Sequence, residues 1–131
     1  MTNFIDLFCG AGGFSTGLEM AGFRCIGGID NVERIVSTHA LNHKFSKSIC
    51  GDIRNISPEE FEKELNGQKV DIIIGGPPCP DFSTAGKNKG VNGDNGKLTK
   101  TYFDLISKMK PDFFVFENVK GLWKTKKHRE F

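Results

Sequence analysis

Short apolar segments alternate with amphipathic stretches along almost the whole chain, and this alternation constrains the fold more than any other feature. A strand covered on both faces is typically a continuous apolar run, whereas a surface helix has apolar residues three to four positions apart. Repeated strand–helix–strand units indicate an α/β fold with a parallel sheet and crossover helices. The expected strands are Phe4–Phe8, Cys25–Ile29, Ser48–Cys50, Val70–Ile74 and Phe113–Phe116.

Four helices are expected between these strands. Ser57-Pro58-Glu59-Glu60 combines a Ser N-cap, a Pro at the first helical position and a Glu three residues after the cap, which is a complete helix start signal. Residues 84–97 are rich in Gly, Asn and Lys and are expected to form a long loop. The other helices are predicted from the apolar spacing of Phe14, Leu18 and Ala21, of Val32, Ile35, Val36 and His39, and of Tyr102, Leu105, Ile106 and Met109.

Composition limits the class of protein. With 131 residues, 37% hydrophobic and 26% charged, the chain is expected to form one globular domain. No apolar run approaches the roughly 20 residues that cross a bilayer and no basic leader precedes one, so a cytoplasmic protein without membrane contact is expected. The four cysteines are far apart and form no C-x-x-C pair, so neither a zinc knuckle nor a disulfide scaffold is expected. No Glu or Cys is expected to complete a metal site with His39 and His43, and the roles expected for these two histidines are packing and solvent contact.

Charge is distributed unevenly along the chain. Residues 1–83 carry 7 Lys and Arg against 11 Asp and Glu, whereas residues 84–131 carry 11 against 5. A solvated lysine-rich surface explains this asymmetry as well as a nucleic acid bound to the second part does, so both interpretations stay open.

A glycine-rich turn follows the first strand in the segment DLFCGAGGFSTG. Gly10 and Gly12 allow the backbone to bend tightly and to approach a ligand at the start of a helix, as in the nucleotide-binding turns of doubly wound folds. Asp30 ends the second strand 20 residues after Gly10, where a carboxylate can accept ribose hydroxyls, and Asp52 follows the third strand at the same sheet edge. NAD and S-adenosylmethionine both contain an adenosine ribose, so these features do not choose between them.

Cys79 directly follows a buried strand, on the rigid stem Gly75-Gly76-Pro77-Pro78. A lone cysteine is usually an inert core residue. However, a thiol held at the carboxyl end of a central strand, beside the expected cofactor edge, has the rigidity that a nucleophile needs.

Glu117 ends the last apolar run, in the segment FFVFENV. A solvated strand end would explain this position. A carboxyl group beside apolar side chains can also hold a proton near neutral pH and donate it to a substrate.

Three segments together resemble a known family. FIDLFCGAGGFSTGLEMAGF, GGPPCPDFS and ENVKGL, in this order, are similar to motifs I, IV and VI of the cytosine-C5 DNA methyltransferases. The resemblance implies a Rossmann-like, S-adenosylmethionine-dependent methyltransferase fold with an incomplete parallel sheet in the order 3-2-1-4-5. In such an enzyme the Cys79 thiolate adds to C6 of cytosine, Glu117 binds N3, and C5 takes the methyl group.

The resemblance also assigns binding roles. It implies that DNA contacts Ser83 and the lysines that follow it, Lys87 and Lys89, and that the target base leaves the duplex. Pro80 stands where the family usually has Gln, which removes the expected DNA contact at that position. The implied cofactor contacts are Phe8, Gly10, Gly12, Asp30, Asp52, Pro78 and Leu98.

Residues 1–131 are expected to form only the N-terminal part of the catalytic domain. The family's target-recognition domain and later motifs have no counterpart in this sequence, so a C-terminal half or second subunit is the expected partner, besides DNA. The apolar strand Phe113–Phe116 would lie at an open sheet edge and favour self-association. The alternatives are a tRNA cytosine-C5 methyltransferase, a non-catalytic fragment that binds cofactor or nucleic acid, and, less favoured, a dehydrogenase.

Overall fold

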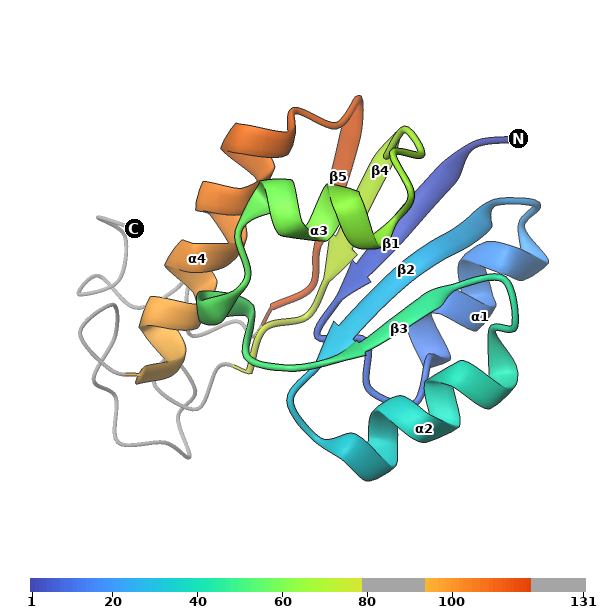
Figure 1. Cartoon of the computed structure of the whole chain (residues 1–131), viewed down its shortest axis with the longest axis horizontal. Coiled ribbons are helices and arrows are strands. Elements are labelled where there is room, and N and C mark those ends of the chain that lie inside the picture. Colours follow the sequence, from blue (N-terminus) through green and yellow to red (C-terminus); the bar gives the residue numbers. More distant parts are fainter. Residues whose placement is uncertain (79–93, 119–131) are drawn as a thin grey trace.

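A five-stranded parallel sheet forms the centre of the computed structural model, which describes residues 1–78 and 94–118 (Figure 1). The strand order is β3-β2-β1-β4-β5, which confirms the expected order and the α/β class. The sequence pattern located all five strands to within two residues at either end. Their bounds are β1 Asn3–Leu7, β2 Arg24–Asp30, β3 Lys47–Cys50, β4 Ile72–Gly75 and β5 Phe113–Phe116.

Helices cover both faces of the sheet (Figure 1). Helices α1 (Gly13–Met20) and α2 (Glu33–Asn42) lie on one face, and α3 (Pro58–Glu64) and α4 (Asp94–Met109) lie on the other, with the short 3₁₀ helix η1 (Ile53–Asn55) after β3. Alternate residues of each strand point to opposite faces. Phe4 therefore packs with Leu18 of α1, whereas its neighbour Ile5 joins the larger core around Phe61 and Tyr102.

The start of α3 is as expected. The Ser57 side chain accepts a hydrogen bond from the Glu60 backbone N–H at 3.1 Å, and the Glu60 carboxylate accepts one from the Ser57 N–H at 2.8 Å. This reciprocal pair satisfies two N–H groups that have no partner within the helix.

Two local expectations were wrong. Helix α4 begins at Asp94, so residues 94–97 belong to the helix rather than to the expected loop, of which residues 84–93 lie outside the described residues. Asp and Asn are favoured at helix starts, and the buried Tyr102 and Leu105 anchor the helix further along. In α1 the buried residue is Ser15, while Phe14 is 39% exposed, because Ser15 binds a buried carboxylate in the sheet.

Strand β5 lies at an edge of the sheet and presents apolar side chains. Phe113, Phe114 and Val115 are 70%, 51% and 44% exposed. An exposed apolar edge strand is a template for pairing with another chain. Among the residues that the structure describes, no helix combines the length and apolar character needed to cross a membrane.

We predict that the 131-residue chain on its own self-associates through β5. The substitution Phe113→Lys places a charge at this edge and is expected to lower the average mass in solution toward that of the monomer, as measured by analytical ultracentrifugation. Leu41→Lys is the control, because Leu41 is 75% exposed but lies on α2, away from β5. Equal effects of the two lysines would contradict a specific role of the edge strand.

Candidate functional site

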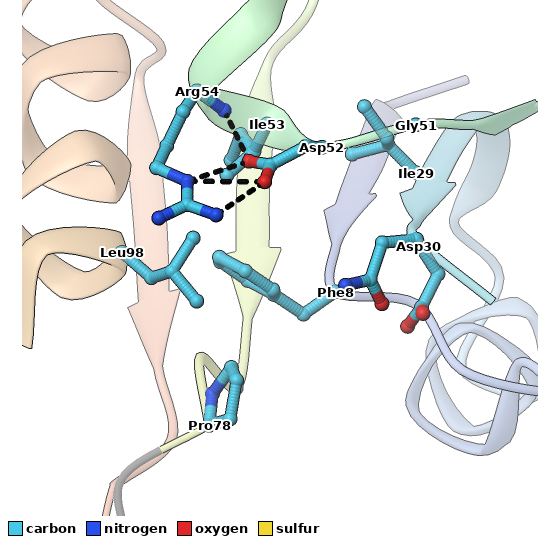
Figure 2. Close-up of a pocket in the computed structure, with 11 residues that line it drawn as sticks. Phe8, Ile29, Asp30, Gly51, Asp52, Ile53, Arg54, Pro78 and Leu98 are labelled. Carbon is cyan, nitrogen blue, oxygen red and sulfur yellow. Dashed lines mark hydrogen bonds and ion pairs between the residues drawn. The ribbon is translucent and has the colours of Figure 1, made fainter. Parts of the chain in front are cut away.

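The carboxyl ends of β1, β2, β3 and β4 surround a cavity of about 250 Å³ (Figure 2). Parallel strands bring these ends to one edge of the sheet, which is where open α/β folds bind their ligands. Five of the seven expected cofactor residues line this cavity: Phe8, Asp30, Asp52, Pro78 and Leu98. The other lining residues are Ile29, Asn31, Gly51, Ile53, Arg54 and Gly76.

The glycine turn fixes the carboxylate of Asp30. Gly10 and Gly12 have φ angles of +55° and +96°, in the left-handed region that favours glycine. The Gly10 N–H donates to Oδ2 of Asp30 at 3.0 Å, and the Val32 N–H donates to Oδ1 at 3.2 Å. Each carboxylate oxygen thus has one backbone donor and can still accept a hydrogen bond from a ligand.

Phe8 has an unusual backbone conformation, with a φ angle of +68°. The backbone N–H groups of Phe8 and Cys9 both donate to the Ile29 carbonyl, at 2.9 and 3.0 Å, which holds the chain in this left-handed geometry. Its side chain points toward those of Leu98 and Pro78, which come from α4 and from the segment after β4 (Figure 2). These three residues form the apolar side of the cavity.

Arg54 holds the carboxylate of Asp52 on the other side of the cavity (Figure 2). Its Nε donates to Oδ1 at 2.9 Å and to Oδ2 at 3.0 Å, its Nη2 donates to Oδ2 at 2.5 Å, and its backbone N–H donates to Oδ1 at 2.9 Å. These hydrogen bonds hold the pKa of Asp52 below its usual range. The sequence interpretation missed Arg54. Its position two residues after Asp52 allows its backbone N–H to bind the aspartate side chain, as it does here.

A second hollow of about 380 Å³ adjoins the first and shares Phe8 and Gly76 with it. Its other lining residues are Asp6, Cys9, Phe14 and Glu117. The Glu117 N–H donates to the Gly75 carbonyl at 3.0 Å, and its exposed carboxylate lies over Gly76. A Cβ atom on Gly76 would stand 2.8 Å from Glu117 Oε2, so a larger residue there would make the flexible carboxylate shift from this position.

Asp6 is a functional candidate that the sequence interpretation missed. Its side chain is 1% exposed, and burial raises its pKa to about 6, while the Ser15 hydroxyl donates a hydrogen bond to Oδ2 at 2.6 Å. Asp6 could have been found from the sequence, because it is a carboxylate inside the apolar run FIDLF, a position that predicts burial. Nearby, burial lowers the pKa of His39 to about 4.

His39 in α2 and His43 at its C-cap are both buried, at 0% and 3% exposed, so packing is the correct one of their two expected roles and solvent contact is wrong. Nδ1 of His43 lies 2.7 Å from Glu19 Oε2, so this buried ring nitrogen has a hydrogen-bond partner.

Within residues 1–78 and 94–118, no three His, Cys, Asp or Glu side chains are arranged to hold a metal ion. Cys9 and Cys25 are buried, and burial raises the pKa of both thiols. The expected residues Cys79, Ser83, Lys87 and Lys89 lie outside the described residues.

Comparison with known proteins identifies the family. Residues 2–131 match the family described as C-5 cytosine-specific DNA methylase. The chain therefore belongs to the cytosine-C5 DNA methyltransferase family, whose reaction requires a methyl donor.

Two similar sequences are named Type II methyltransferases. M.NmeDI of Neisseria meningitidis serogroup C is 44% identical over 99% of this chain and 34% of its own length, and M.XorII of Xanthomonas oryzae pv. oryzae is 38% identical over 97% and 30%. The chain thus spans about a third of these curated relatives.

Solved structures have the same fold. A putative DNA modification methyltransferase encoded within an E. coli prophage has a TM-score of 0.82 and 33% identity, covering 96% of this chain and 34% of that one. The S. pombe Dnmt2 methyltransferase has a TM-score of 0.71 at 18% identity, covering 98% of this chain and 38% of that one, and supports the fold alone.

We predict that Asp6 makes stability depend on pH. Its pKa is raised from 3.8 to about 6, so the folded state binds the proton more tightly than the unfolded chain. Stability is therefore lost as the pH rises from about 4 to about 6, and the loss is on the order of 3 kcal/mol above that range. Asp6→Asn keeps an acceptor for Ser15 without the charge.

Urea unfolding of both proteins across this pH range tests the prediction. The Asn variant is expected to match the parent near pH 4 and to be more stable at neutral pH. His39 has the opposite pH dependence, since its pKa is lowered, but it is present in both proteins and cancels in the difference. A stability difference that does not change with pH would contradict the role of Asp6 charge.

Proposed function

We propose that this chain is the cofactor-binding and catalytic part of an enzyme that transfers a methyl group from S-adenosylmethionine to C5 of cytosine in DNA. The observation that carries the proposal is the pair of adjoining hollows at the carboxyl edge of the sheet. One contains Asp30 and Asp52, and the other contains Glu117. Because the chain belongs to the cytosine-C5 family, we assign the first hollow to the methyl donor and the second to the cytosine.

The residues of the first hollow fit an adenosine-containing methyl donor. Asp30 is oriented by two backbone N–H groups and retains acceptor capacity for the two ribose hydroxyls. Phe8, Leu98 and Pro78 offer apolar surface to a flat base. Asp52 is the proposed acceptor for the adenine amino group, which has to replace one of the hydrogen bonds that Arg54 donates to its carboxylate. S-adenosylmethionine, when bound, supplies an electrophilic methyl group.

The residues at the ends of β4 and β5 activate the cytosine. Cytosine C5 is a weak nucleophile, so the Cys79 thiolate adds to C6 and forms a C–S bond, which moves electron density to C5 and N3. Glu117 binds N3 with a proton and stabilises the negative charge that develops there. The methyl group would reach C5 as its bond to the sulfonium sulfur breaks, with S-adenosylhomocysteine as the leaving group. Water then takes the C5 proton, and cleavage of the C–S bond releases the Cys79 thiolate and restores the C5–C6 double bond.

DNA is the proposed substrate, and its contacts fall in the basic part of the chain. Residues 84–131 have 11 Lys and Arg against 5 Asp and Glu, which suits a phosphate backbone, and Ser83, Lys87 and Lys89 are proposed to bind it. The target cytosine has to leave the base stack, because C6 is attacked from a face that stacking covers. The base-reading residues are proposed to lie in a partner or in further chain, because this chain spans about a third of its relatives.

We predict that the chain binds S-adenosylmethionine weakly and that Asp30→Ala weakens the binding by about tenfold. Loss of a charge-assisted hydrogen bond to a hydroxyl is worth about 1.5 kcal/mol, which gives that factor. Calorimetry measures the affinity, and Glu59→Ala on the distant α3 is the control for loss of a carboxylate. Equal binding by the two variants would contradict the role of Asp30.

We predict that methyl transfer requires Cys79 and Glu117. The chain is combined with the remaining part of a full-length relative, and transfer of labelled methyl groups to duplex DNA and to tRNA is measured. Cys79→Ser should abolish transfer, and Glu117→Gln should slow it by a factor on the order of 100 or more. Full activity of the serine variant would overturn the covalent mechanism.

The same assays separate the alternatives. Transfer to tRNA but not to DNA would support an RNA methyltransferase with the same mechanism. Cofactor binding without transfer to either substrate would support a non-catalytic binding fragment, and binding of NAD in place of S-adenosylmethionine would support a dehydrogenase.

A further inference from the structure

The C-terminal end of α2 contacts the glycine turn through backbone carbonyls that Asp30 does not bind. The Asn42 side-chain amide donates to the Ala11 carbonyl at 3.3 Å, and His43 Nε2 lies 3.2 Å from the Gly12 carbonyl oxygen. Two consecutive carbonyls of the turn are therefore held by the last residue of α2 and by its C-cap residue.

The hydrogen-bond partners of His43 define the protonation of its ring. A carbonyl oxygen can only accept, so Nε2 must carry the proton in its bond to Gly12. Nδ1 lies 2.7 Å from Glu19 Oε2, and a proton must lie between these two atoms as well. The His43 side chain is 1% exposed, so Glu19 is a buried imidazole's acidic neighbour and orients the ring toward the turn.

His43 also contacts the turn sterically. A Cβ atom built on Gly12 would lie 2.7 Å from His43 Cδ2 and closer still to Nε2, and 3.1 Å from His39 Cδ2. The Gly12 φ angle of +96° is unfavourable for any residue with a side chain. The turn can therefore sit directly against the two imidazole rings, whose centroids are 4.5 Å apart.

The Gly12 carbonyl does not need His43 for its own satisfaction. The Thr16 N–H and the Thr16 hydroxyl both donate to it at 2.8 Å. The hydrogen bond from His43 therefore adds a link between α2 and the turn rather than filling a vacant acceptor. Because α2 begins three residues after Asp30, this link fixes the turn relative to the carboxylate that the Gly10 N–H binds.

We propose that His43, oriented by Glu19, is a positioning residue that holds the glycine turn in the geometry that binds the cofactor. The substrate side of this inference rests on the proposed function, since it assumes that the turn binds S-adenosylmethionine. His43 itself does not line the first hollow. It acts through the Gly12 carbonyl, and its loss should loosen the turn before it affects the sheet.

The experiment compares variants of the full chain by two independent measurements. Hydrogen exchange of the Gly10 and Gly12 amides, which bind Asp30 and the Cys9 carbonyl, reports the turn directly and needs no ligand. Calorimetry with S-adenosylhomocysteine reports the effect on binding. His43→Phe keeps the ring size and removes both hydrogen bonds, whereas His43→Gln keeps an N–H donor.

Ser48→Ala is the matched control. The Ser48 hydroxyl lies 2.7 Å from His39 Nδ1, so its loss disturbs the same buried layer without touching Gly12. His43→Phe is expected to speed exchange of the Gly10 and Gly12 amides about tenfold relative to the control and to weaken binding about fivefold to tenfold. His43→Gln should recover part of both effects.

The outcomes are distinct. Unchanged exchange at both glycines in His43→Phe, or an increase equal to that in Ser48→Ala, would overturn the positioning role. If the parent chain does not bind S-adenosylhomocysteine, the proposed function fails while the exchange data still decide the role of His43. If His43→Phe does not fold, the variants Glu19→Ala and Glu19→Gln replace it. Only the Gln side chain keeps a hydrogen bond to His43 Nδ1, so Glu19→Ala is expected to speed exchange of the Gly10 and Gly12 amides more than Glu19→Gln does. Equal exchange in these two variants would overturn the proposal.

Discussion

Parallel pairing of β1 with β2 on one side and with β4 on the other organises the whole structure. Leu7 pairs with Ile29 and with Gly75, so the segments that follow the three strands leave the sheet at the same level. The chain moves outward in one direction from β1 to β3 and returns to the other side of β1 with β4. Both hollows lie at this reversal, where helices on opposite faces leave the strand ends uncovered.

The sequence predicted the parts of this arrangement that depend on local pattern. Continuous apolar runs defined the strands, and the capping signal at Ser57 defined the start of α3. Asp30 and Asp52 could be assigned to one edge because the carboxyl ends of parallel strands always meet there. The strand order needed the family resemblance as well, since five strands of similar apolar character can be ordered in many ways.

The sequence did not predict the contacts that cross between elements. Asp6 and Ser15 are nine residues apart, and His43 is 24 residues from Glu19 and 31 from Gly12, so no local period connects them. Polar residues on a helix are usually solvated, and solvent contact was one of the two roles expected for His39 and His43. His43 is buried against Glu19 of α1 and the Gly12 carbonyl, and these groups come together only in the packed fold.

The left-handed backbone of Phe8 has a consequence for the two hollows. An aromatic residue in this conformation carries strain of about 1 kcal/mol or more that glycine would relieve, and the paired N–H groups on the Ile29 carbonyl hold it there. Phe8 lines both hollows, so this strained residue belongs to the boundary that they share with Gly76. A glycine at this position would relieve the backbone strain but would remove the phenyl ring from the lining that the two hollows share.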